Sequence, residues 1–196
     1  MKPEMISREF HVERRPGFVM VYPFTTYVTV FDKTDKPNLR KLNAYFRRLL
    51  RYGCPDYKEK RSVSKGRILM VEKEACDYAL QPLAWSSDYE GLGDKQHEHL
   101  QDYLHANDPF TYSTEIPVWS EIGEDMELLH GHIDGVRHLP DDRVEVWDFK
   151  PGAEKETRAS SQLLRYGHLL SLRTGISLSD IDLYYFDKNY AYKLVL

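Results

Sequence analysis

Two apolar runs between Gly131 and Lys150 constrain the fold most strongly. They lie on either side of a polar turn, Pro140-Asp141-Asp142, and the second run is Val144-Glu145-Val146-Trp147-Asp148-Phe149-Lys150. Two β-rich runs joined by a turn predict a β-hairpin. Because alternate residues of a strand share a face, the second strand begins with core valines and ends with Asp148 and Lys150 side by side.

Asp134, on the first strand of this hairpin, can reach the same end. Two carboxylates beside an ammonium at the edge of a core could hold a hard divalent cation and handle a phosphate group. The Asp-x-Lys pattern is also common among solvated surface charges. The hairpin alone therefore leaves open whether these charges are functional.

Length and composition narrow the class of protein. A chain of 196 residues with 41% hydrophobic residues suits one domain, or a core with a small appendage. The sequence has no apolar run of about 18 residues, and its first residues lack the apolar segment of a signal peptide. We therefore expect an intracellular (cytoplasmic) protein with no membrane partner. Its two cysteines, Cys54 and Cys76, are too few for a Cys-rich zinc site or an unaided iron–sulfur cluster.

The net charge of −4 hides a basic block between Lys36 and Arg67. This block holds eleven Lys or Arg against two acids, so it carries +9 and leaves −13 for the rest of the chain. A basic block on an acidic protein is typical of a surface that binds a polyanion. Charge alone is equally compatible with a solvated helix face, here that of a helix carrying Arg47 and Arg48.

Hydrophobic periodicity and turn residues predict the remaining elements. Asn38 is a candidate cap for the basic helix, and Gly53 is its expected end. Pro23 divides the first strand-like region into a hairpin or two edge strands. The expected helices cover residues 39–50, 72–80, 93–106 and 159–174, and the expected strands lie within 18–31, 67–71, 114–119, 182–186 and 191–196.

Several polar residues on these elements are candidates for the same site. His97 shares a helix face with Leu100 and Leu104, where a histidine is more often a core residue than a ligand. Glu115 could approach a metal, although such a residue is more often an exposed strand charge. His130 and His132 share strand parity with Asp134, and we expect structural or surface roles for them first.

The helix over residues 159–174 adds a second polar pair. Gln162 and Tyr166 are spaced i, i+4 and therefore lie on one face of the helix. Arg158 and Arg165 could reach a phosphate from the same helix. A polar helix face packed against a neighbouring element explains the pair equally well.

Four short motifs now follow one another along the chain: Gly93-x3-His97, Gly131-x2-Asp134, Asp148-Phe149-Lys150 and Gln162-x3-Tyr166. In this order and on these elements, they resemble the PD-(D/E)XK nuclease superfamily, in its RecB-like branch. That branch includes helicase-linked nuclease domains and the exonucleases of CRISPR adaptation. The resemblance covers residues 93–196.

The resemblance implies a role for each matching residue. Asp134 and Asp148 correspond to the metal-binding acids, Lys150 to the catalytic lysine, and His97 to a helix histidine that binds metal. The backbone carbonyl of Phe149 would be a further metal ligand. Gln162 and Tyr166 correspond to the motif that steadies DNA. The implied cofactor is Mg²⁺ or Mn²⁺, and no iron–sulfur cluster is expected, because the relatives' four cysteines are missing.

The implied fold is α/β (α+β): a restriction-endonuclease-like core with a central mixed sheet flanked by helices. We assign residues 93–196 to this core, and residues 1–92 to an N-terminal appendage of strands and a basic, DNA-gripping helix. Together they would form a single compact unit.

The implied activity is a metal-dependent DNA nuclease, with an exonuclease acting on single strands or DNA ends as the leading expectation. A structure-specific or restriction-type endonuclease is the enzymatic alternative, although such enzymes usually lack the Gln-x3-Tyr helix. A DNA-binding or assembly module with a decayed active site is the alternative of another class. DNA is the expected partner, and a helicase or recombination protein would fit as a second one. A chain that ends with its core leads us to expect a small mobile-element, viral or repair nuclease.

Overall fold

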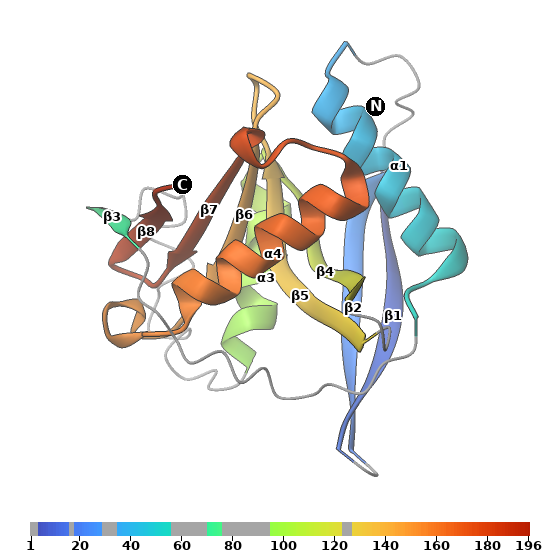
Figure 1. The fold of residues 1–196 in the computed structure, drawn as a ribbon, viewed down its shortest axis with the longest axis horizontal. Helices are drawn as coiled ribbons and strands as arrows, with labels where there is room; N and C mark the ends of the chain where they lie inside the picture. Colours follow the sequence, from blue (N-terminus) through green and yellow to red (C-terminus); the bar gives the residue numbers. More distant parts are fainter. Residues whose placement is uncertain (1–3, 16–17, 29–34, 56–69, 76–94, 123–126) are drawn as a thin grey trace.

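The computed structural model describes residues 4–15, 18–28, 35–55, 70–75, 95–122 and 127–196. These residues form one sheet of eight strands, mostly antiparallel, with three α-helices packed against it (Figure 1). In sheet order the strands are β1 (Glu4–Arg15), β2 (Phe18–Val28), β4 (Thr111–Ile122), β5 (Glu127–His138), β6 (Val144–Phe149), β7 (Ile181–Phe186), β8 (Tyr190–Leu194) and β3 (Val71–Ala75). The helices are α1 (Pro37–Tyr52), α3 (Gln96–Asn107) and α4 (Ala159–Thr174), with short 3-10 turns η2 (Ala153–Lys155) and η3 (Leu178–Asp180).

The sheet separates two apolar layers. Helices α1 and α4 lie over one face, and α3 lies behind the other (Figure 1). Strand β6 is buried along its whole length because both of its faces are covered. Its Val144 and Val146 pack in the α1/α4 layer, whereas Trp147 and Phe149 pack in the α3 layer with Leu100 and Leu104.

The mixed α/β fold and the central hairpin are confirmed. Strands β5 and β6 pair antiparallel, and β6 and β7 pair parallel, which requires a crossover connection. Helix α4 supplies that crossover with the bounds that its sequence predicts, and it ends at Gly175 with a left-handed φ of 75°. The polar ends of β5 and β6 and the Gln162–Tyr166 face of α4 thus belong to one supersecondary unit.

The N-terminal strands differ from the prediction. Residues 18–28 form one continuous strand that pairs with β1. The sequence analysis did not predict strand β1. Pro23 does not break this strand, because β2 pairs with β4 only at Thr25 and Thr26 and leaves the proline outside that ladder. Since β2 joins β4, the N-terminal hairpin extends the same sheet, and the boundary at residues 92/93 stays a prediction.

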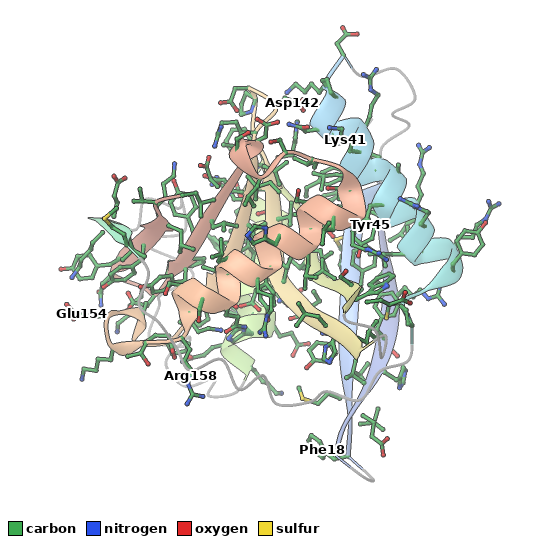
Figure 2. The ribbon with its side chains drawn as sticks, viewed as in Figure 1. Phe18, Lys41, Tyr45, Asp142, Glu154 and Arg158 are labelled. Atoms are coloured by element: carbon green, nitrogen blue, oxygen red, sulfur yellow. The ribbon has the colours of Figure 1, made fainter. Side chains whose placement is uncertain are left out.

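Two local predictions are wrong. Residues 71–75 form β3, paired with β8, where the beginning of a helix over 72–80 was expected. Helix α1 begins two residues before its predicted start, at Pro37, and Asn38 lies inside it instead of capping it. The carboxylate of Asp142, in the β5–β6 turn, accepts the backbone N–H groups of Asn38 and Leu39 at 2.9 and 3.2 Å (Figure 2). The cap therefore comes from a distant turn.

Several predictions fall outside the described residues: the strand over 67–69, the helix over 76–80, Cys76 and Gly93. No helix of the described part has the length and apolar character needed to cross a membrane.

Candidate active site at the open end of the β5–β6 hairpin

Glycines on either side of Asp134 allow large side chains to approach β5. A Cβ atom on Gly131 would lie 2.2 Å from Cε1 of Tyr166, and one on Gly135 would lie 2.1 Å from Cζ2 of Trp147. Non-bonded carbon atoms essentially never come this close. Glycine is therefore required at both positions if α4 and β6 are to pack closely around Asp134.

The pairing between strands β5 and β6 ends next to Asp134. Their last residue pair is Gly135 with Trp147, and beyond it the strands no longer share a ladder. The backbone N–H of Phe149 instead donates to Oδ2 of Asp134 at 2.8 Å. The carboxylate thus lies between the two strand ends, and a hydrogen bond that also holds β6 fixes its orientation.

Asp148 and Lys150 lie together at this end, as predicted. The Lys150 ammonium is 2.6 Å from Oδ2 of Asp148, whose side chain is only 1% exposed. Neither oxygen of this carboxylate accepts a hydrogen bond of favourable geometry from the described residues. The backbone N–H of Lys150 donates to the carbonyl of Phe186 at 2.9 Å, so β7 holds the lysine's backbone in place. The site therefore contains a buried carboxylate with unsatisfied acceptor capacity.

Helix α3 brings His97 to the same place. Its Nδ1 is 3.3 Å from Oδ2 of Asp134, and its ring meets the ring of Phe149 edge-on at 5.1 Å. Leu100 and Leu104 anchor the helix in the α3 layer. His97 is therefore a member of the charged cluster and not a core histidine. The other two histidines lie elsewhere: His132 stacks on Tyr22 of β2, and His130 is paired with Trp119 of β4.

Glu115 is the candidate site residue that sequence reasoning undervalued. It lies opposite Asp134 between two paired positions of β4 and β5, with a left-handed φ of 51°. Gln101 of α3 donates to its Oε1 at 2.7 Å and lies 3.4 Å from the backbone carbonyl of Asp134. Glu115 is thus a half-buried acid turned into the cluster, not an exposed strand charge. Its place opposite Asp134 depends on the β4–β5 register, which the sequence pattern does not give.

The carboxylates of this cluster affect one another's protonation. Burial, followed by the charge of Asp134, raises the pKa of Asp148 to about 7 and that of Glu115 to about 7. Burial also opposes ionisation of Asp134, but His97, Lys150 and the Phe149 amide outweigh it and lower the pKa. Ionising all three carboxylates at once is therefore unfavourable, although two cations lie beside them.

The carboxylates favour the charged forms of the cluster's two cations, Lys150 and His97. Burial alone would lower the pKa of Lys150, but Asp148 and Asp134 together raise it. Burial likewise opposes protonation of His97, and its contact with Asp134 more than compensates, so its pKa is raised. Lys150 is therefore a charged ammonium directed at two carboxylates.

The predicted Gln162–Tyr166 pair also lies at the site. Gln162 Nε2 donates to the Tyr166 hydroxyl at 2.6 Å, and the tyrosine is buried against Gly131. Burial and the charge of Asp148 both raise the pKa of Tyr166, which places this phenol near the carboxylates. The pair is therefore oriented from α4 toward the hairpin end.

The predicted arginines are spread more widely. Arg158 is exposed and lies directly before α4 (Figure 2), whereas Arg165 is half-buried with its guanidinium carbon 6.0 Å from the Tyr166 ring centre. Arg47 and Arg48 are exposed on α1, which packs beside α4. Arg165 thus lies beside Tyr166 of the predicted polar pair.

The chemistry of these side chains fits a divalent cation. Carboxylate oxygens are the ligands that Mg²⁺ and Mn²⁺ prefer, and both oxygens of buried Asp148 have unused acceptor capacity. Asp134, Asp148, Glu115 and His97 would hold the ion. Among the described residues no three His, Cys, Asp or Glu side chains are already grouped tightly enough to ligate it, so small side-chain shifts would accompany binding. The Phe149 carbonyl stays a predicted ligand.

We compared the chain with models of protein families, with curated proteins and with solved structures, and none of them matches it.

Proposed function

We propose that this protein is a divalent-metal-dependent nuclease that hydrolyses phosphodiester bonds in DNA. One observation carries the proposal: Asp134, Asp148 and Glu115 converge with Lys150 at the open end of one hairpin. Acidic side chains are rarely buried, and buried charges are normally paired or bind metals. A cluster of one buried and two partly buried acids with one lysine suits chemistry on a phosphate.

Each residue has a role that follows from its position. When bound, a divalent ion supplies an activated water and offsets the charge that grows on the phosphate. Asp134 and Asp148 hold the ion, with Glu115 and His97 as neighbouring ligands. The ammonium of Lys150 orients the attacking water or stabilises charge on the phosphate oxygens. Tyr166 and Gln162 line the side of the cluster beneath α4 and steady the strand there.

The four motifs in order support membership of the PD-(D/E)XK superfamily, RecB-like branch. Two features of the geometry agree with that assignment. The acids and the lysine lie at the end of a hairpin whose second strand is followed by a crossover helix, and the Gln-x3-Tyr pair on that helix faces them. On this basis we infer an exonuclease acting on single-stranded DNA or on DNA ends.

The decisive experiment measures cleavage of end-labelled single- and double-stranded DNA, with and without Mn²⁺. We expect cleavage that requires the metal and is abolished in Asp148→Asn. Asp102→Asn is the matched control, since Asp102 is an exposed acid on α3 outside the cluster. Metal-independent cleavage, or an active Asp148→Asn variant, would contradict the proposal.

Two further measurements separate the alternatives. A closed circular single strand is cut only by an endonuclease, so its survival supports the exonuclease. Calorimetric titration with Mn²⁺ tests the non-enzymatic alternative, because a decayed DNA-binding module would bind no metal at these acids. Metal binding that disappears in Asp148→Asn supports the enzyme.

A further inference from the structure

A concave feature lies away from the carboxylate cluster, between α1, α4 and β4. It is a pocket of about 390 Å³ lined by Tyr45, Arg48, Leu49, Tyr52, Gly53, Trp119, Leu172 and Arg173. Tyr45 lies between α1 and α4 (Figure 2), and its hydroxyl donates to the carbonyl of Pro117, which fixes one wall. The volume is in the range of sites for small molecules.

The pocket presents two guanidinium groups without acidic partners. No described acid lies within ion-pair distance of Arg48 or Arg173. Arg173 is held over the Trp119 ring at 4.7 Å, yet its buried Nε has no hydrogen-bond partner among the described residues. A buried donor left unsatisfied is costly, and an anion in the pocket would remove that cost.

A neighbouring arginine reduces the repulsion that an anion would meet at the end of α1. The C-terminal end of a helix carries partial negative charge, which would repel one. Here Arg8 neutralises that end, since its Nη1 donates to the carbonyls of Leu49 and Leu50 at 3.2 and 2.8 Å. The carbonyls at this end of α1 are thus partly satisfied, and the positive charge of Arg48 and Arg173 remains available.

The pocket also offers flat apolar surface. Tyr52 is 71% exposed and Leu172 is 67% exposed, and both lie at the pocket. Aromatic faces beside arginines bind nucleotides well, because the base stacks on the ring while the guanidinium binds the phosphate. A simple inorganic anion would leave these apolar faces unused.

We propose that this pocket binds a nucleotide unit, with its phosphate between Arg48 and Arg173 and its base against Tyr52, near Trp119. Arg173 follows Tyr166 by seven residues, two helical turns or about 10 Å along α4. At the duplex spacing of about 3.4 Å per phosphate, this separation of Arg173 from Tyr166 corresponds to about three nucleotides. The pocket's assignment to a strand of DNA, and not to a free nucleotide, rests on the proposed function.

Binding is measured without divalent metal, in EDTA, so that the result does not depend on cleavage. The probe is a fluorescein-labelled single-stranded oligonucleotide of about a dozen nucleotides, followed by fluorescence anisotropy. We expect Arg48→Ala and Arg173→Ala each to weaken binding about tenfold and to reduce the salt dependence by about 0.7 in slope. Arg40→Ala is the matched control, because Arg40 is exposed on the same helix about 12 Å from Arg48.

A second titration distinguishes a strand from a free nucleotide. Binding of dAMP should quench the fluorescence of Trp119, and Trp119→Phe should remove that change. Loss of oligonucleotide binding in the two arginine variants supports a strand unit, whereas loss of dAMP binding alone supports a free nucleotide. Wild-type binding of both probes by Arg48→Ala and Arg173→Ala, or an equal loss in Arg40→Ala, would overturn the pocket assignment.

These results stand apart from the cleavage assay. If no variant or wild-type protein cleaves DNA but both arginine variants still lose binding, the nuclease proposal fails and the pocket assignment survives. Arg173→Lys keeps the charge and loses the planar group over Trp119. Compared with Arg173→Ala, this variant should therefore recover most of the salt dependence of oligonucleotide binding but little of the fluorescence quenching by dAMP.

Discussion

Oδ2 of Asp134 accepts the backbone N–H of Phe149 at 2.8 Å, at the point where β5 and β6 stop pairing. One carboxylate thus completes the hydrogen bonding of a central strand and belongs to the charged cluster. The structural and chemical contributions of Asp134 can be separated, because they depend on different properties of the side chain.

Replacing Asp134 by asparagine should separate them. An asparagine oxygen can still accept the Phe149 N–H, so we expect little change in the free energy of unfolding. Cleavage should fall more than about 100-fold, since even groups that only support a metal ligand cost 10–100-fold when removed. Asp134→Ala should also lower the free energy of unfolding by about 1–3 kcal/mol, because it leaves a buried amide unpaired. Urea unfolding and the cleavage assay, run on both variants, provide the test, and equal stabilities would contradict it.

Replacing Lys150 by methionine should divide metal binding from catalysis. The ammonium lies 2.6 Å from Asp148 and competes with a cation for that carboxylate. Removing it should leave Mn²⁺ affinity unchanged or tighter in calorimetry, while kcat falls about 100- to 1000-fold with little change in KM.

The control for this variant is Lys155→Met, an exposed lysine in η2. A Lys150→Met variant that loses metal binding would contradict this separation and show that the lysine organises the metal site.

The close approach of α4 to β5 predicts a strong coupling between Gly131 and Tyr166. A methyl group on Gly131 would overlap the tyrosine ring, so Gly131→Ala should lower the free energy of unfolding by about 1–3 kcal/mol and displace Tyr166. In a Tyr166→Ala background the same substitution should cost less than about 0.5 kcal/mol. A double-mutant cycle by urea unfolding measures this coupling. Additive effects would mean that the two residues do not meet.

The parts of the fold that the sequence predicts are those with local causes. Helix α4 has an apolar stripe and a terminal glycine, and the β5–β6 hairpin has a turn between two β-rich runs. The proximity of Asp134, Asp148 and Lys150 follows directly from that hairpin. For this reason most of the charged cluster could be predicted without knowledge of the rest of the sheet.

The errors arise where distant contacts override local preference. Strand β3 reads Val-Glu-Lys-Glu-Ala, which favours a helix, but it pairs with β8 at the sheet edge. The cap of α1 comes from Asp142, about a hundred positions away, and no local pattern contains that information. Glu115 enters the cluster because β4 pairs with β5 in one particular register, which strand parity alone does not give.

The last prediction concerns His105 on α3, whose burial lowers its pKa to about 4. Its Nε2 lies 3.0 Å from Oγ1 of Thr114, and its Nδ1 is buried without a partner among the described residues. An unfolded histidine has a pKa of about 6.5, so below that pH the unfolded chain binds the proton more readily than the folded protein. Above pH ~6.5 this residue is neutral in both states and does not reduce the free energy of unfolding. As the pH falls from ~6.5 toward 4, it reduces the free energy of unfolding by up to about 3 kcal/mol.

The test compares wild type with His105→Gln by urea unfolding at a series of pH values. Glu115 and Asp148 have raised pKa values and act in the opposite sense over part of this window, but their contributions cancel in the difference between the two proteins. The wild type should lose its advantage over the variant as the pH falls from about 6.5 to 4. His168→Gln, an exposed position on α4, is the control and should show no such trend. A difference between wild type and His105→Gln that stays constant with pH would mean that His105 is protonated as easily in the folded protein as in the unfolded chain.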